Sequence, residues 1–304
     1  MALGCLPRMW QLKRQGQLDI IDAHFAYPDG YAATLLGRWL GVPVTITMRG
    51  TETRHTNDSA LRPLIITAMS KANRVFSVSD SLRQIAISCG IDTSKLRVIG
   101  NGVDISKFSP QSKNKARASL GISGAAKVIV TVGGLCERKG FHRVIAALPE
   151  LIKKYPDLIY LIIGGPSPEG DMTKQLQQLV SELNLGSAVK FLGAMAADKL
   201  GQPLSAADVF VLSTRNEGWA NVLLEAMACG LPVVATDVGG NREVVSNPSV
   251  GTIVPFDDHA ELIAAITQSL DTHWDRAAIR AYAEANTWDK RVDTLVQEFR
   301  ALSH

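Results

Sequence analysis

Short apolar runs alternate with longer segments of helical period along most of this sequence. Runs of this length between helical segments are predicted to be strands. Strands that alternate with helices in this way form β-α units that feed parallel sheets, so the predicted fold class is α/β. The predicted strands are residues 19–24, 43–48, 75–78, 96–99, 127–133, 157–165, 189–193, 208–213, 232–236 and 251–255.

A domain boundary is predicted in residues 101–115, NGVDISKFSPQSKNK, which are rich in Asn, Gly, Ser and Pro and lack an apolar period. Four predicted strands precede this segment, and the six that follow suffice for a complete Rossmann-like domain. We therefore expect a partial first domain at residues 1–108, a second domain at 109–285 and a helix at 286–304 that packs back on the first. The first half begins on a helix rather than on a strand with a glycine-rich turn. A fragment, a misassigned start and a truncated paralogue are each compatible with that beginning.

Composition excludes several classes of function. The net charge of +3 is spread along the 304 residues without a long basic block, so no nucleic-acid partner is expected. The four cysteines form no C-x-x-C pair and have no histidine at metal spacing, which predicts reduced thiols, a cytoplasmic protein and no bound metal. No apolar stretch approaches the roughly 20 residues that span a bilayer. The absence of such a stretch does not exclude peripheral contact with the inner face of a membrane.

The segment NEGWANVLLEAMACG, residues 216–230, places Glu225 in an otherwise apolar helix with no visible partner. A carboxylate in such surroundings is costly unless it is paired or hydrogen-bonded. Either Glu225 reaches solvent or a cation, or its partner is a ligand. Glu217 follows the predicted strand at 208–213, so both glutamates lie near the carboxyl end of a parallel strand, where open α/β sheets bind ligands.

Two further features of the sequence indicate an anion site. The start of the helix that carries Glu225 offers free amides, which attract phosphate. Residues 133–140, GGLCERKG, combine glycines that admit close backbone approach with Arg138 and Lys139, which can neutralise a diphosphate. A basic pair before a helix is more often a solvated turn, and neither the dinucleotide fingerprint nor the P-loop pattern is present. The amides predicted to open the helix belong to Gly218, Trp219, Ala220 and Asn221.

Residues 216–245, NEGWANVLLEAMACGLPVVATDVGGNREVV, are similar to the donor-site signature of retaining glycosyltransferases of family 4. Members of that family have the GT-B fold, in which two Rossmann-like domains face a cleft. The hallmark of the signature is two glutamates separated by seven residues, which Glu217 and Glu225 reproduce. The resemblance extends to residues 132–141, 101–108 and 22–52, and so to nearly the whole chain.

The resemblance implies a role for each of these residues. Glu225 would bind the ribose hydroxyls of a nucleotide sugar, and Glu217 would contact the transferred sugar. Arg138 and Lys139 would stabilise the departing diphosphate as its charge develops. The amides that follow Gly218 would hold sugar and phosphate. The base would lie near the strand ends around Gly164, Gly165 and Leu192.

This sequence departs from the family pattern at two positions besides its start. Many members have an arginine where this chain has Gly134, so the usual pair of phosphate cations is incomplete and Arg138 would substitute. Many have a histidine where this chain has Arg49; because arginine does not act as a base at neutral pH, Arg49 would contact phosphate or sugar, unless it is only a surface residue. His24 and Asp29 are expected in the acceptor cleft, although a lone histidine is more often structural.

The expected function is transfer of a sugar, with retention of configuration, from a nucleotide-sugar donor to a carbohydrate, polysaccharide, lipid-linked or other cell-envelope acceptor. No metal or other cofactor is expected, and peripheral membrane contact is compatible with this role. Two alternatives remain open at the level of sequence. One is a sugar-nucleotide epimerase of similar fold, and the other is a nucleotide-sugar-binding protein without transfer activity.

Overall fold

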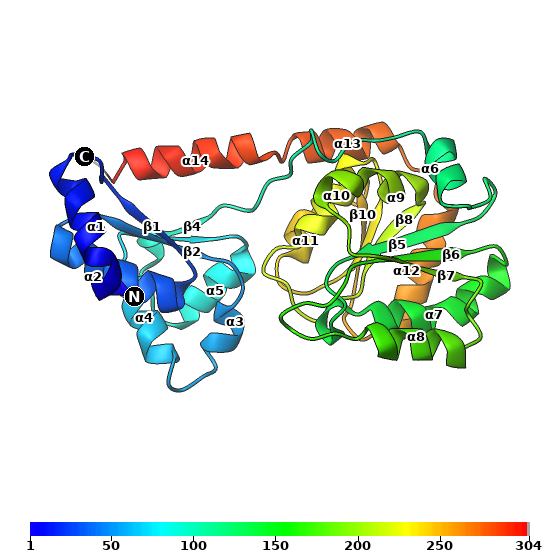
Figure 1. The fold of residues 1–304 in the computed structure, drawn as a ribbon, viewed down its shortest axis with the longest axis horizontal. Coiled ribbons are helices and arrows are strands. Elements are labelled where there is room, and N and C mark those ends of the chain that lie inside the picture. The colour runs from blue at the N-terminus through cyan, green and yellow to red at the C-terminus, as the bar shows by residue number, and fades with distance from the viewer. Residues whose placement is uncertain (303–304) are drawn as a thin grey trace. The chain divides into compact units, whose positions relative to one another are not determined.

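The computed structural model describes residues 1–302, and the chain divides into two compact units (Figure 1). The first unit holds Met1–Asn101 together with the chain from Asp289 onward, and the second unit holds Gly102–Trp288. The predicted domain boundaries lie a few residues away, after residues 108 and 285. Residues 303 and 304 of the predicted C-terminal helical segment lie outside the described residues.

The first unit is built on a parallel sheet of four strands in the order β1-β2-β3-β4. Strand β2 is buried along its whole length, and Ile46, Met48 and Phe76 form the centre of the core. Helix α14 joins this unit through Glu298, which accepts hydrogen bonds of 3.1 Å from both Arg74 and Arg97. The elements of the unit are α1 (Ala2–Arg14), β1 (Ile21–His24), η1 (Ala26–Gly30), α2 (Tyr31–Leu40), β2 (Val44–Met48), α3 (Glu52–His55), α4 (Arg62–Lys71), β3 (Arg74–Ser77), α5 (Asp80–Ser88), η2 (Thr93–Lys95), β4 (Leu96–Val98) and α14 (Trp288–Arg300).

The second unit contains a parallel sheet of six strands in the order β10-β9-β8-β5-β6-β7. This is the doubly wound order of a Rossmann fold, and its topological switch point lies between β5 and β8. Helices α10 and α13 cover one face of the sheet, and α7 and α12 cover the other. The elements are α6 (Lys113–Ser119), β5 (Val128–Val132), η3 (Glu137–Lys139), α7 (Phe141–Lys154), β6 (Ile159–Ile163), α8 (Thr173–Glu182), β7 (Val189–Gly193), η4 (Ala197–Lys199), α9 (Gly201–Ala206), β8 (Val209–Leu212), α10 (Asn221–Ala228), β9 (Val233–Thr236), α11 (Asn241–Val244), β10 (Gly251–Val254), α12 (His259–Asp271) and α13 (Arg276–Glu284).

Each predicted strand is present in the structure, and the predicted ends differ from the observed ends by at most two residues. The prediction of an α/β protein with two parallel sheets is therefore confirmed. One local prediction is corrected, because the end of the predicted linker at residues 101–115 already belongs to α6. No helix within residues 1–302 has the length and apolar character needed to cross a membrane.

Candidate donor site and acceptor-side cluster

The switch point of the second unit brings together three residues that the sequence singles out. Arg138 and Lys139 lie on η3, which follows β5, and Glu217 lies in the loop that follows β8. Oε1 of Glu217 accepts hydrogen bonds from Nη1 of Arg138 at 3.0 Å and from Nζ of Lys139 at 2.7 Å. Because the side chain of Glu217 is only 9% exposed, the two cations supply the charge that a buried carboxylate requires.

Arg138 has a second carboxylate partner that the sequence did not indicate. Its Nε and Nη2 atoms each donate a hydrogen bond of 2.6 Å to Glu169, which forms a bidentate pair. Nη1 of Arg138 also donates to the carbonyl of Asn216 at 2.8 Å. The hydrogen bonds to Glu169, followed by the charge of Glu217, raise the pKa of Arg138 despite partial burial. Four N–H groups of the guanidinium are therefore hydrogen-bonded to groups of the protein itself.

Glu225 lies on α10 with its side chain partly buried. Burial raises the pKa of its carboxyl group from an ordinary 4.5 to about 7, and the nearby charge of Lys139 acts in the opposite direction. None of residues 1–302 forms a hydrogen bond with this carboxylate, and Lys139 directs its own bond to Glu217. The half-buried acid thus keeps its hydrogen-bonding capacity open.

The start of helix α10 differs from the prediction. The helix begins at Asn221 with Ala220 as its N-cap, so Gly218 and Trp219 lie in the preceding loop. The N-cap residue Ala220 makes no side-chain capping hydrogen bond. Nε1 of Trp219 is buried and has no hydrogen-bond partner within the described chain. The four predicted residues therefore flank the helix start instead of all belonging to it.

Close packing of the neighbouring strand ends explains two of the predicted glycines. A Cβ atom on Gly134 would lie 2.7 Å from Cβ of Ser167, so the position has no room for a side chain. At Gly164, where φ is +154°, a Cβ would lie 1.8 Å from the carbonyl oxygen of Gly133. Leu192 is on β7, beside β6, and packs partly buried against the apolar core of the unit.

In the first unit, His24 and Arg49 contact each other at the carboxyl ends of β1 and β2. Nε of Arg49 donates to Nδ1 of His24 at 2.7 Å, and Nη1 of Arg49 donates to Asn101 at 3.2 Å. The other ring nitrogen of His24 lies 3.3 Å from Asp22. Burial lowers the pKa of Arg49, and the charge of Asp22 opposes this shift. Asp29 lies on η1 and makes no hydrogen bond to the described residues.

Glu52 is a site-forming residue that sequence reasoning missed. Its side chain is 1% exposed, and its carboxylate accepts hydrogen bonds from the amides of Ala26, Arg49 and Gly50 at 2.9, 3.2 and 3.0 Å. These bonds tie the turn after β1 to the turn after β2 and so fix the backbone that carries Arg49. The available signal was a glutamate in the segment MRGTE, directly after a predicted strand.

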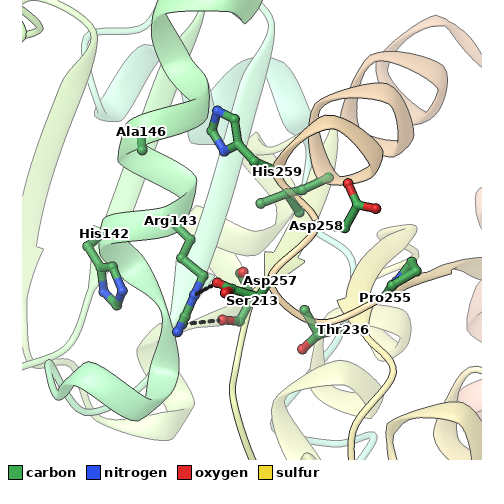
Figure 2. A pocket seen from close by; sticks show the side chains of 10 residues that line it. His142, Arg143, Ala146, Ser213, Thr236, Pro255, Asp257, Asp258 and His259 are labelled. Carbon is green, nitrogen blue, oxygen red and sulfur yellow. Dashed lines mark hydrogen bonds and ion pairs between the residues drawn. The ribbon is translucent and has the colours of Figure 1, made fainter.

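A separate cavity of about 130 Å³ lies between α7 and α12 at the carboxyl ends of β8, β9 and β10 (Figure 2). Arg143 closes one side, since it donates to the carbonyl of Ser213 at 3.2 Å and lies 3.6 Å from Asp257. Pockets that hold ligands of drug size measure about 300–1,000 Å³. This cavity is too small for a nucleotide sugar.

Two family models match nearly the whole chain. Residues 112–286 match the model described as glycosyl transferases group 1, and residues 1–107 match the model described as glycosyltransferase family 4. The chain belongs to the group 1 glycosyl transferases. The family recognised from the signature of Glu217 and Glu225 is thereby confirmed, and with it the expectation of a glycosyltransferase rather than an epimerase.

Curated relatives and solved structures agree with this assignment. A D-inositol 3-phosphate glycosyltransferase of Corynebacterium urealyticum is 33% identical over 93% of this chain and 72% of its own length. The enzyme of the same name from Geodermatophilus obscurus is 33% identical over 77% of this chain and 53% of its own length. The chain thus spans between about half and about seven tenths of these relatives.

The structural comparisons establish the GT-B fold. The Anabaena protein HepE, solved in complex with UDP, superimposes with a TM-score of 0.86 at 23% identity, over 97% of this chain and 82% of HepE. Sucrose-phosphate synthase from Thermosynechococcus elongatus superimposes with a TM-score of 0.78 at 24% identity, over 98% of this chain and 78% of the synthase.

Proposed function

We propose that this chain transfers a hexosyl group from a nucleotide sugar to a hydroxyl acceptor with retention of configuration. The observation that carries the proposal is the arrangement around Lys139, which bonds Glu217 and lies near the unpaired carboxylate of Glu225. A ribose diol would satisfy Glu225, and the sugar hydroxyls would contact Glu217. Lys139 lies between them, where the diphosphate that links ribose and sugar would pass.

Lys139 and Arg138 would act as electrostatic catalysts in this reaction. Negative charge grows on the diphosphate as the bond to the sugar breaks, and fixed cations stabilise that charge more in the transition state than in the ground state. The positive end of the helix dipole at the start of α10 would favour the same phosphates. Since the protein supplies these charges itself, we propose that transfer needs no divalent ion.

The acceptor would bind near His24 and Arg49. Their hydrogen bond leaves Nε2 of His24 facing Asp22, and the side chain of His24 is 47% exposed. A hydroxyl-rich or phosphate-bearing acceptor matches this polar surface. Because curated relatives are D-inositol 3-phosphate glycosyltransferases, a polyol phosphate joins carbohydrates and lipid-linked sugars among the acceptors to be tested.

Peripheral membrane contact is proposed for helix α1. Leu3 and Trp10 of this helix are 76% and 52% exposed, and the guanidinium of Arg14 lies 4.6 Å from the ring centre of Trp10. Exposed apolar side chains next to cations suit the surface of an anionic leaflet. Co-sedimentation with vesicles that contain phosphatidylserine, lost in Trp10→Ser and absent with neutral vesicles, would support this contact; equal sedimentation of both proteins would contradict it.

Transfer can be tested with UDP-, GDP- and ADP-hexoses as donors. Acceptors would be inositol 3-phosphate, simple sugars and a cell-envelope extract, with the anomeric configuration of the product read by NMR. We expect Lys139→Ala and Glu217→Gln to lower kcat by at least about 100-fold. Glu182→Gln, the same change at the far end of α8, is the control. Inverted products, or activity abolished by a chelator and restored by magnesium, would contradict the proposal.

A further inference from the structure

The loop that carries Glu169 is held at both ends by the backbone of Leu135, which lies between β5 and η3. The amide of Leu135 donates to the carbonyl of Gly165 at 2.8 Å, and the carbonyl of Leu135 accepts from the amide of Met172 at 2.7 Å. Within the loop, Ser167 and Gly170 exchange two backbone hydrogen bonds of 3.0 Å. Because hydrogen bonds fix both ends of the loop and also join Ser167 to Gly170, the position of Glu169 is well defined.

This loop also fills the space beside Gly134. Ser167 lies so close that any side chain at position 134 would collide with it. Glu169 from the same loop accepts hydrogen bonds from two nitrogens of Arg138.

The charges around Arg138 balance without any ligand. Arg138 and Lys139 are matched by Glu217 and Glu169, so a diphosphate that entered beside all four groups would meet two carboxylates. The two carboxylates differ in accessibility, since the side chain of Glu217 is 9% exposed and that of Glu169 is 51% exposed. Glu169 can turn into water at little cost, while Glu217 cannot.

We propose that Glu169 is a resident counter-ion that the diphosphate of the donor must displace from Arg138, and that Glu169 thereby sets the affinity of the donor site. The inference rests on the proposed function, and it names a specificity-determining residue of that site. A phosphate group presents two oxygens to a guanidinium in the same fork as a carboxylate, so the exchange conserves the hydrogen bonds of Arg138. Exchange also explains how an arginine that already pairs with a carboxylate can still bind a donor.

The experiment compares wild-type protein with Glu169→Gln, which removes the charge and keeps the shape. Isothermal titration with inorganic pyrophosphate and with UDP, GDP and ADP gives the affinities. We expect Glu169→Gln to bind pyrophosphate and the preferred nucleotide about 10-fold more tightly, because the competing carboxylate is gone. Glu169→Asp, which keeps the charge, should bind less tightly than Glu169→Gln.

Two controls separate this effect from a general change of charge. Glu150→Gln removes an exposed carboxylate that pairs with Lys153 on α7, and we expect it to leave the affinities unchanged. In an Arg138→Ala background, Glu169→Gln should have no further effect, because the counter-ion has lost its partner. An equal gain in both backgrounds would show a long-range charge effect and would overturn the inference.

The remaining outcomes distinguish this inference from the proposed function. If nucleotides bind the wild type and lose affinity in Glu225→Ala, yet Glu169→Gln binds no more tightly, the donor site stands and the counter-ion role is wrong. Weaker binding by Glu169→Gln would mean that Glu169 positions Arg138 for the ligand, which also overturns the inference. If neither nucleotides nor pyrophosphate bind any of these proteins, the proposed function and the inference fail together.

Discussion

The fold contains one buried glutamate in the first unit and one partly buried glutamate in the second, and the two differ in whether the protein supplies hydrogen-bond donors. Glu52 of the first unit is almost fully buried, and three backbone amides satisfy its carboxylate. Glu225 of the second unit is partly buried among apolar residues, and no described residue donates a hydrogen bond to it. The carboxylate of Glu52 is satisfied by the protein itself, whereas that of Glu225 is left for a ligand under the proposed function.

The comparison separates structural from functional burial of charge. A buried acid that the chain itself satisfies contributes to stability, and its removal leaves amides without partners. An acid that the chain leaves open is a cost to the folded state, and a ligand that donates hydroxyl groups offsets that cost. The two classes should therefore respond differently to substitution and to ligand.

The largest effect is expected for Glu52→Ala. Three amides lose their acceptor in the core of the first unit, so the free energy of unfolding should fall by about 3–5 kcal/mol. Urea unfolding followed by circular dichroism measures this loss. Glu225→Ala, measured alongside, should lose less than about 1 kcal/mol. Equal losses in the two variants would remove the distinction between the two glutamates.

The second effect concerns binding of the nucleotide. Glu225→Ala should weaken the preferred nucleoside diphosphate by about 1–3 kcal/mol, because hydrogen bonds from the ribose to a charged group are lost. Binding of pyrophosphate, which has no ribose, should be unchanged. Calorimetry of both ligands tests this pair of expectations, and a parallel loss of pyrophosphate affinity would contradict the ribose assignment.

The third effect is the pH dependence of stability. The pKa of Glu225 is raised in the folded state to about 7, so the folded protein holds this proton more tightly than the unfolded chain, whose value is near 4.5. As pH rises from 4.5 to 7, the unfolded state releases its proton first, and stability falls. Glu225→Gln should remove this penalty and be more stable than wild type by about 3 kcal/mol at pH 8, and the difference should vanish below about pH 4.

Thermal unfolding of wild type and Glu225→Gln across this pH range measures the effect. Binding should respond in the opposite sense, because ribose hydroxyls prefer the ionised acid. Nucleotide affinity of the wild type is therefore expected to rise as pH passes through about 7 and to level off above about pH 8. A stability difference that is independent of pH would show that Glu225 keeps an ordinary pKa.

The smallest effect is expected for Lys139→Met. The charge of Lys139 lowers the pKa of Glu225, so its removal should raise that pKa further by less than about one unit. Carbon-13 NMR of labelled glutamate carboxyls can follow the titration, with Lys153→Met on the exposed face of α7 as the matched control. A fall in the pKa of Glu225 would mean that burial is not its main cause.

The sequence predicted much of the fold because the relevant signals are local. Strand runs such as residues 189–193 and 251–255 stand out by their own composition, and their ends were predicted to within two residues. Ser79 directly precedes α5, where serine is a favoured N-cap residue, and its hydroxyl accepts a hydrogen bond from the amide of Leu82. The family signature likewise lies within one short segment that contains Glu217 and Glu225.

The contacts that form the site were harder to predict from the sequence. Glu169 lies in a loop of Pro, Ser and Gly residues, and nothing in that loop indicates that it reaches Arg138. Gly239, with φ of +53°, packs so that a Cβ would lie 1.6 Å from the carbonyl oxygen of Glu217, which no spacing rule suggests. Each contact joins the ends of different strands, and only the assembled sheet brings those ends together.

The sequence alone determined the two parallel sheets, the family and the main candidate site residues. Hydrophobic periodicity and a glutamate within an apolar helix can both be recognised from a few adjacent positions. The tertiary structure decided that β8 lies beside β5, that Arg138 already pairs with Glu169, and that Glu52 is satisfied while Glu225 is not. Strand order depends on how the crossover helices pack, and the state of a buried charge depends on donors from distant segments. Neither the strand order nor the state of a buried charge can be predicted from the residues adjacent in sequence.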